Sequence, residues 1–204
     1  MHPLKKLYCR TFQTVFKLAI PFLPYRSPEL LHGMDELIDK LKALKLNHVL
    51  LVTDKGIRSL GLTSRLEQLM EQNNIFCTVY DGTVANPTTD NVEEALHLYK
   101  ENNCQALIGF GGGSSMDCAK AVGACIARPK TPLMKMKGIL KVLRPLPPLF
   151  AVPTTAGTGS ETTLAAVITD ACTRVKYPIN DFPLIPRYAV LDPEVTRSLP
   201  PFIT

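Results

Sequence analysis

The chain has 204 residues, 46% of them hydrophobic and 20% charged, which is enough to bury one domain core and carry a small appendage. Its net charge is +5, but the basic residues lack the interleaved aromatic side chains of a single-strand binder, which argues against nucleic acid as a partner. The six cysteines form no C-x-x-C pair, which is typical of a reducing compartment and predicts a cytoplasmic location. The four histidines lack metal-ligand spacing, so we predict no metal site in this chain.

The first 25 residues predict an amphipathic helix. Apolar residues fall near one helical face, and Lys5, Lys6, Arg10 and Lys17 fall largely elsewhere. These basic residues interrupt the apolar core that a secretory signal needs, and no stretch approaches the ~20 apolar residues of a membrane span. We favour a helix that packs on the body of the protein or on a partner subunit over one that lies on a membrane surface.

The remainder of the chain predicts alternating strands and helices. An apolar period of 3.6 predicts a helix over residues 29–46. Predicted strands cover residues 48–53, 75–80, 105–110, 149–152 and 188–191, and predicted helices cover residues 63–72, 90–101 and 117–127. Residues 128–148 predict a plain surface connection with a short helix, and residues 164–177 predict a hairpin. Alternation of this kind predicts an α/β fold, a Rossmann-like parallel sheet with helices on both faces.

A glycine-rich loop joins the third predicted strand to its helix. It reads Gly109-Phe110-Gly111-Gly112-Gly113-Ser114-Ser115-Met116-Asp117. Four glycines let backbone N–H groups approach a ligand, and a helix N-terminus adds unpaired N–H groups and partial positive charge, which suits a phosphate or pyrophosphate. The loop is neither G-x-G-x-x-G nor a P-loop. The alternative is a tight turn in which glycine serves geometry alone.

A second loop, residues 154–163, follows the fourth predicted strand and carries five threonines and one serine. Such a run is often only a turn, but both loops follow parallel strands and should meet at the carboxyl edge of the sheet, where α/β folds bind ligands. Asp54 ends the first predicted strand. It is suited to accept hydrogen bonds from an adenosine ribose and to repel a 2′-phosphate, which favours NAD over NADP; the alternative is a turn residue.

Two motifs resemble the iron-containing (group III) alcohol dehydrogenases. Residues 111–120, GGGSSMDCAK, are similar to the family pattern G-G-G-S-x-x-D-x-A-K, and residues 153–161, PTTAGTGSE, resemble its second signature almost letter for letter. Three shorter motifs also fall in the family's order and spacing: Val52-Thr53-Asp54, Asn86-Pro87-Thr88 and Leu191-Asp192-Pro193-Glu194. The resemblance covers about residues 30–204, and the first 25 residues do not match.

The resemblance implies a set of cofactor contacts. Gly112, Gly113 and Ser114 would hold the pyrophosphate, and Asp117 would lie near the nicotinamide. Asp54 would contact the adenosine ribose. The remaining residues that the resemblance places in the cofactor cleft are Asn86, Thr154, Thr155, Thr158, Thr163 and Lys176.

The resemblance also implies that the metal lies outside this chain. Family members are nearly twice as long and hold iron, or zinc, through one aspartate and three histidines in a helical second domain that begins just after Leu199-Pro200-Pro201. We therefore expect residues 29–204 to be a dinucleotide-binding domain truncated before that domain, with residues 1–28 as an appendage. We expect no catalytic residue in the chain and little turnover by the chain alone.

Three functions follow as alternatives. The first is the cofactor-binding half of an NAD-dependent, metal-dependent alcohol dehydrogenase, which transfers a hydride between an alcohol or aldehyde and nicotinamide. The second is the corresponding half of a relative of glycerol dehydrogenase or dehydroquinate synthase, although the sequence of residues 155–161 favours the first alternative. The third is a non-catalytic nucleotide-binding or interaction module. The expected partners are a small alcohol or aldehyde and further copies of the chain, as a homo-oligomer.

Overall fold

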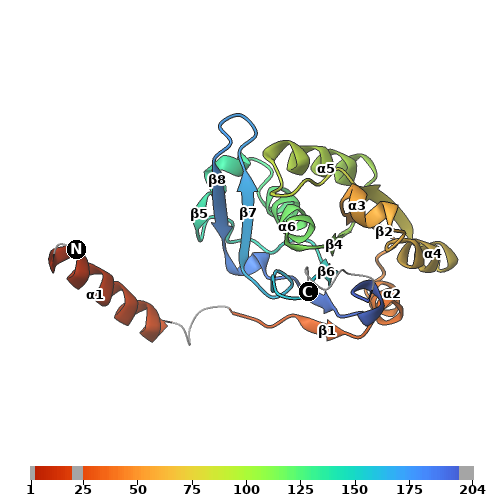
Figure 1. Ribbon diagram of the computed structural model, residues 1–204, viewed down its shortest axis with the longest axis horizontal. Helices are drawn as coiled ribbons and strands as arrows, with labels where there is room; N and C mark the ends of the chain where they lie inside the picture. The colour runs from red at the N-terminus through yellow and green to blue at the C-terminus, as the bar shows by residue number, and fades with distance from the viewer. Residues whose placement is uncertain (1–2, 20–24, 198–204) are drawn as a thin grey trace.

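The structure, a computed structural model, describes residues 3–19 and 25–197. Within these residues, six parallel strands form the main sheet in the order β1-β9-β6-β4-β2-β3 (Figure 1). The strands are Glu29–Leu31 (β1), His48–Val52 (β2), Phe76–Tyr80 (β3), Ala106–Gly111 (β4), Leu149–Pro153 (β6) and Tyr188–Val190 (β9). The predicted Rossmann-like parallel sheet is therefore confirmed.

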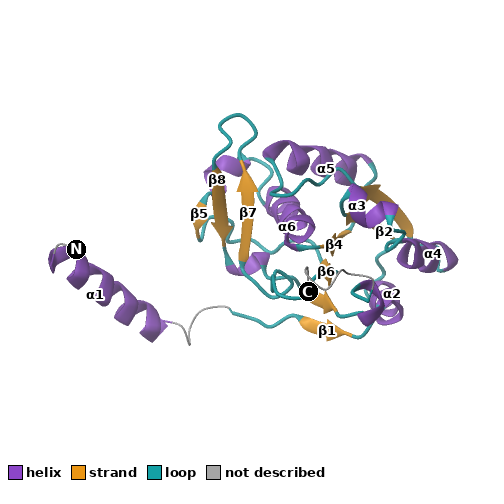
Figure 2. Ribbon diagram, in the orientation of Figure 1, coloured by secondary structure: helices purple, strands orange, loops and turns teal. Residues whose placement is uncertain are grey.

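Helices cover both faces of this sheet, as Figure 2 shows. Successive strand residues point to opposite faces, so Val49 and Leu51 pack in one buried cluster, and Leu50 and Val52 pack in the other. Met34–Ala43 (α2) and Ser64–Gln72 (α4) cover the first cluster, and Thr89–Glu101 (α5) and Gly113–Ala127 (α6) cover the second. The remaining short helices are Lys55–Ser59 (α3) and the 3-10 turns Leu133–Met136 (η2), Phe182–Leu184 (η3) and Pro193–Val195 (η4).

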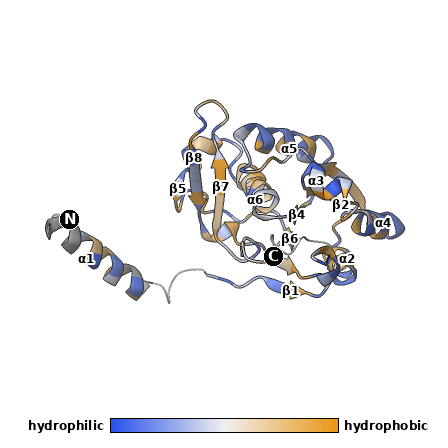
Figure 3. Cartoon of the chain, in the orientation of Figure 1, coloured by the Kyte–Doolittle hydropathy of each residue, from blue (hydrophilic) through white to orange (hydrophobic). Residues whose placement is uncertain are grey.

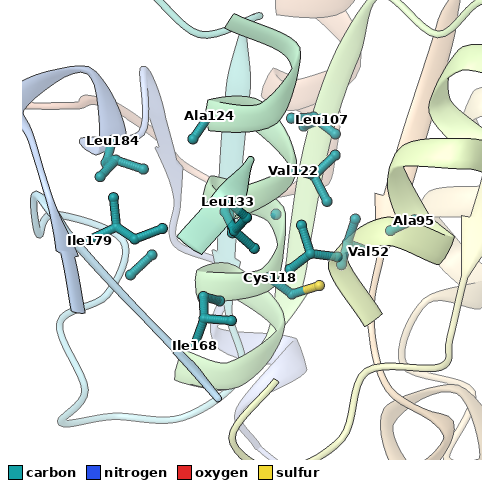
Figure 4. Packing of buried hydrophobic residues seen from close by; sticks show 14 of the residues in the cluster. Val52, Ala95, Leu107, Cys118, Val122, Ala124, Leu133, Ile168, Ile179 and Leu184 are labelled. Atoms are coloured by element: carbon teal, nitrogen blue, oxygen red, sulfur yellow. The ribbon is translucent and has the colours of Figure 1, made fainter. Parts of the chain in front are cut away.

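A smaller sheet packs against α6. Its strands are Gly138–Ile139 (β5), Ala165–Thr169 (β7) and Lys176–Asn180 (β8), in the order β5-β8-β7. The antiparallel pair β7 and β8 is the hairpin that the sequence predicted. Figure 4 shows Ile168 and Ile179 of this hairpin on one side of α6, and Cys118 and Val122 on its other side, toward Val52 of the main sheet. The hairpin thus holds α6 from the side opposite the main sheet.

The prediction of a plain surface connection for residues 128–148 is incomplete. Leu133, Met136 and Val142 are buried, and Arg128 Nε donates to the Val142 carbonyl oxygen at 2.6 Å. The backbone N–H of Val142 in turn donates to Asp181 at 2.8 Å. The segment contains the short helix that we predicted, as η2, but it also adds β5 to the smaller sheet because these apolar side chains complete its core.

Two predicted helices have different boundaries. Residues 29–31, predicted as helix, form β1, because they pair in parallel with β9 and Gly33, at φ 95°, interrupts the helical backbone before α2. The helix predicted to begin at residue 117 begins instead at Gly113. The weak helix propensity of glycine and serine concealed this first turn in the sequence. The N–H groups of the glycine-rich loop are therefore those of a helix terminus.

The amphipathic helix predicted near the start forms as α1, Pro3–Ala19. It lies apart from both sheets (Figure 1), so the structure does not show it packed on the body of the protein. Packing on a partner subunit stays a prediction. Within the described part of the chain, no helix combines the length and the apolar character needed to cross a membrane. The Leu199-Pro200-Pro201 segment lies outside the described residues.

Candidate cofactor site

A pocket of about 560 Å³ opens at the carboxyl ends of β2, β4 and β6. Its lining residues are Asp54 to Ile57, Asp81 to Ala85, Gly112 to Ser115, Thr154 and Thr155. The two loops that the sequence predicted to face each other thus form opposite walls of one pocket. Six of the predicted site residues line it together: Asp54, Gly112, Gly113, Ser114, Thr154 and Thr155.

The first wall is the glycine turn, residues 111–115. Gly111 has φ +142°, and a Cβ atom at this position would lie 2.7 Å from Ser115 Oγ, so only glycine fits without rearrangement. A Cβ atom at Gly112 would lie 3.7 Å from Thr155, in the space between the walls. No side chain among the described residues caps the start of α6. Its first N–H groups are therefore available to an anionic ligand.

The second wall is the hydroxyl loop, residues 154–163. The backbone N–H of Thr154 donates to the Gly111 carbonyl oxygen at 3.0 Å, which joins the two walls at their base. The Oγ1 atoms of Thr154 and Thr155 are buried and have no hydrogen-bond partner among the described residues. Leaving a buried hydroxyl unpaired costs about 1–3 kcal/mol. These two threonines therefore fit a bound ligand with polar oxygens, such as a phosphate or a ribose.

The two carboxylate oxygens of Asp54 accept hydrogen bonds from two different parts of the pocket wall. Its Oδ1 accepts from the Ile57 backbone N–H at 2.9 Å and caps α3, a short helix that the sequence analysis missed. Its Oδ2 accepts from Ser115 Oγ at 3.4 Å, beside the glycine turn. Both sequence interpretations of Asp54, as a turn residue and as a pocket residue, are thus compatible with its position. The carboxylate keeps lone pairs that a sugar hydroxyl could donate to.

Asn86 and Lys176 lie next to this pocket but outside its lining set. The backbone N–H of Asn86 donates to Ser114 Oγ at 3.2 Å. Its side-chain Oδ1 accepts from Lys176 Nζ at 2.7 Å. The hairpin therefore brings Lys176 to the start of α6 through Asn86, although the two residues are far apart in the sequence.

Asp117, Thr158 and Thr163 also lie outside the lining set. Thr158 approaches the start of α6, since a Cβ atom at Gly113 would lie 3.5 Å from its methyl carbon. Asp117 accepts from Ser160 Oγ at 2.8 Å and from the Val167 N–H at 3.0 Å, and its burial raises the pKa of its carboxyl group. Its predicted place near the nicotinamide stays a prediction. In the structure it fixes the hydroxyl loop and β7 to α6.

Lys120 is the residue that the search for site residues missed. Its side chain is fully buried, and Nζ donates to Ser160 Oγ at 3.1 Å, to Thr163 O at 3.0 Å, to Thr163 Oγ1 at 2.9 Å and to Ala165 O at 2.9 Å. Burial lowers the pKa of this lysine to about 8, although Asp117 and Glu161 favour its charged form. Its position in the motif at residues 111–120, three residues after Asp117, was the available signal. We call Lys120, Asp117 and Ser160 the lysine clamp.

The comparison with known protein families identifies the family of this chain. Residues 31–193 match the model of the iron-containing alcohol dehydrogenases. The chain belongs to this family. Its relatives in the family include alcohol dehydrogenase 4 of Schizosaccharomyces pombe, which is 36% identical over 196 residues, or 94% of this chain and 46% of that protein. An NAD-dependent methanol dehydrogenase of Bacillus methanolicus is 35% identical over 84% of this chain and 45% of its own length.

Solved structures of the same family share the fold. A 1,3-propanediol oxidoreductase superposes with a TM-score of 0.82 at 32% identity, covering 88% of this chain and 48% of the other. A sulfoacetaldehyde reductase from Bifidobacterium kashiwanohense, solved in complex with NAD+, gives a TM-score of 0.77 at 30% identity over 88% and 48% of the two chains. The chain thus spans about half the length of the iron-containing alcohol dehydrogenases that it matches. Within its described residues, no group of three or more His, Cys, Asp or Glu side chains is arranged to hold a metal ion.

Proposed function

We propose that this chain binds NAD(H) between the glycine turn and the hydroxyl loop, as the cofactor-binding half of a metal-dependent alcohol dehydrogenase. The observation that carries the proposal is the pair of buried, unpartnered hydroxyls of Thr154 and Thr155, opposite the uncapped start of α6. Two family relatives support the choice of cofactor: one is named as an NAD-dependent dehydrogenase, and the other was solved in complex with NAD+.

Each part of the pocket has a separate task in this proposal. The first N–H groups of α6 and the Ser114 hydroxyl bind the pyrophosphate, since both donate hydrogen bonds and the helix terminus favours negative charge. Thr154 and Thr155 donate their hydroxyl protons to oxygen atoms of the cofactor. Asp54 accepts hydrogen bonds from the adenosine ribose. Bound NAD supplies a nicotinamide ring that accepts a hydride from the substrate alcohol.

The proposed substrates are small alcohols or the matching aldehydes. The names of family relatives support this class, since they include methanol, 1,3-propanediol and lactaldehyde. By the resemblance in the two motifs, the family's metal ligands belong to a second, helical domain. We therefore propose that these 204 residues hold the cofactor and do not oxidise an alcohol by themselves.

Titration of the chain with NADH and NADPH, followed by nucleotide fluorescence or calorimetry, tests the cofactor assignment. We expect NADH to bind more tightly, and Asp54→Ala to reduce the preference by about tenfold, because a like charge opposite the 2′-phosphate is removed. Asp39→Asn, an exposed change on α2, is the matched control and should leave the preference unchanged. Failure of both nucleotides to bind would contradict the proposal, and tighter NADPH binding would contradict the role of Asp54.

A turnover assay tests the second part of the proposal. The chain is mixed with NAD+, ferrous iron or zinc, and methanol, ethanol or 1,3-propanediol, and NADH formation is followed by absorbance. We expect no metal-dependent turnover above that of the nucleotide and metal alone. Steady formation of NADH would show that these residues contain a complete catalytic site and would contradict the assignment as a cofactor-binding half.

A further inference from the structure

Two segments of the chain carry basic residues and no acidic ones. Residues 1–28 contain five lysines and arginines, and residues 128–148 contain six. The whole chain has 23 basic and 18 acidic residues, so the other 155 residues have 12 basic and 18 acidic ones. The net charge of +5 therefore combines a charge of +11 on these two segments with one of −6 on the rest. We call the described part of residues 1–28, namely residues 3–19 and 25–28, the first basic segment, and residues 128–148 the second basic segment.

The two basic segments meet at a surface cavity of about 390 Å³ that shares no lining residue with the cofactor pocket. Arg26 of the first segment, Leu143 of the second and Arg187 all line it. The Arg26 guanidinium donates to the carbonyl oxygen of Ile185 at 2.6 Å and to that of Pro186 at 3.3 Å, which fixes it at this place. Burial and the neighbouring Arg187 lower the pKa of Arg26, so positive charge is crowded here.

The basic side chains of these segments that the structure describes form no ion pair with the described part of the protein. Neither Arg26 nor Arg187 forms an ion pair with any described residue, and the same holds for Arg10, Lys17 and the six basic residues of 128–148. Exposed aliphatic side chains lie among them: Ile139 is 65% exposed and Leu143 is 62% exposed. The second basic segment therefore presents charge and apolar surface together.

Helix α1 shows the same combination in a regular form. Tyr8, Val15 and Leu18 are 71%, 61% and 70% exposed, and their spacing puts them on one side of a helix. Tyr8 also stacks on Phe12, with ring centroids 6.5 Å apart. Figure 3 shows hydrophobic and hydrophilic residues along α1, which stands away from the two sheets. An amphipathic helix with a basic polar face is the standard element that lies in a lipid interface.

In place of the packing that the sequence favoured for the first helix, we propose that the two basic segments form one surface that binds an anionic lipid bilayer, with α1 lying in the interface. A nucleic acid would use the charge but leave the apolar side of α1 exposed. A protein groove around α1 would leave the second segment without a partner. A bilayer with acidic headgroups can contact the charged side chains of both segments and the apolar side of α1, because it presents a broad negative surface above an apolar layer. No residue of the cofactor pocket takes part, so this inference is independent of the proposed function.

Sedimentation with lipid vesicles tests the proposal. The 204-residue chain is mixed with sucrose-loaded vesicles of phosphatidylcholine alone, or of phosphatidylcholine and phosphatidylserine in equal parts, and the pelleted protein is quantified. We expect binding to the mixed vesicles, release by salt and little binding to neutral vesicles. Sedimentation that is equal for both vesicle types, or absent for both, would overturn the proposal.

Paired variants test the contribution of each segment. Arg10→Gln with Lys17→Gln, and Lys141→Gln with Arg144→Gln, should each lower partition into mixed vesicles about 25-fold, or about fivefold for each charge removed. Val15→Asn with Leu18→Asn should reduce binding as well. These side chains are exposed, so the folded body should be preserved.

Two controls make the result specific. Arg65→Gln with Lys42→Gln removes two exposed charges on α4 and α2, on the face of the main sheet opposite residues 128–148, and should leave partition within about twofold of the unmodified chain. If this pair lowers binding as much as the α1 pair, net charge alone drives it and the proposal fails. It also fails if Val15→Asn with Leu18→Asn leaves lipid binding unchanged but converts a dimer to a monomer in sedimentation equilibrium, since α1 would then be a subunit contact.

Discussion

The two walls of the cofactor pocket are shaped by different physical means. The glycine turn is set by its backbone, with Gly111 at φ +142° and α6 packed between two sheets. The hydroxyl loop has no regular structure, and a Cβ atom at either Gly157 or Gly159 would meet no other atom within 4 Å. Side-chain hydrogen bonds to Lys120 hold it instead. One wall thus depends on packing contacts, and the other depends on the buried cation of Lys120 together with the Ser160–Asp117 and Thr154–Gly111 hydrogen bonds.

The largest effect should come from removal of that cation. Lys120→Met keeps the volume but leaves the acceptors of Thr163 and Ala165 unpaired, and leaves Asp117 without its cationic neighbour at 3.9 Å. We expect the free energy of unfolding to fall by about 3 kcal/mol and NADH affinity to fall with it. Urea unfolding and nucleotide titration measure the two changes. Lys100→Met, at an exposed lysine on α5, is the control, and an equal effect of both changes would show that the clamp is unimportant.

A smaller effect should follow from Gly111→Ala in the other wall. The new methyl group would lie 2.7 Å from Ser115 Oγ, in a backbone conformation that alanine rarely adopts. We expect a loss of about 2 kcal/mol in unfolding free energy. Gly157→Ala separates the two causes, because it has φ +119° but open space around it, and we expect it to cost about 1 kcal/mol. Equal losses would mean that crowding does not shape the glycine turn.

The smallest effect should be a pH dependence set by Lys120. Burial lowers the pKa of Lys120 to about 8, so the folded protein releases this proton at a lower pH than the unfolded chain does. The free energy of unfolding, measured by urea titration, should therefore rise by about 1 kcal/mol between pH 8 and pH 9. Lys120→Arg stays charged and should lack this step. The same pH profile in both proteins would exclude Lys120 as its source.

Local sequence patterns predicted much of the fold. The buried strands β2 and β4 are apolar runs that need no distant information, and the two loops after strands identified both walls of the pocket. β1 was mistaken for helix because Leu30 and Leu31 continue the apolar period of α2, while the strand that pairs with them, β9, lies far along the chain. Only the tertiary structure provides that information.

The lysine clamp shows which part of the site could not be predicted from the sequence. Lys120 follows Asp117 by about one helical turn, and that spacing is visible in the sequence. The acceptors that surround its ammonium group come from Ser160, Thr163 and Ala165, which lie 40 to 45 positions later in the chain. A search by residue type and spacing finds ligand-facing loops, but it does not find the buried group that sets the distance between them.

The pairing of β1 with β9 has a consequence for folding during synthesis. Glu29 lies opposite Tyr188, 159 positions later, so this edge of the sheet cannot form until nearly all of the described chain has left the ribosome. Contacts of such long range close slowly because the intervening chain must first be ordered. β2, β3 and β4 follow one another in the chain and lie side by side in the sheet, so they can assemble earlier. We therefore expect the nascent protein to hold a preformed half-sheet, with the β6 edge of β4 open until the later strands arrive.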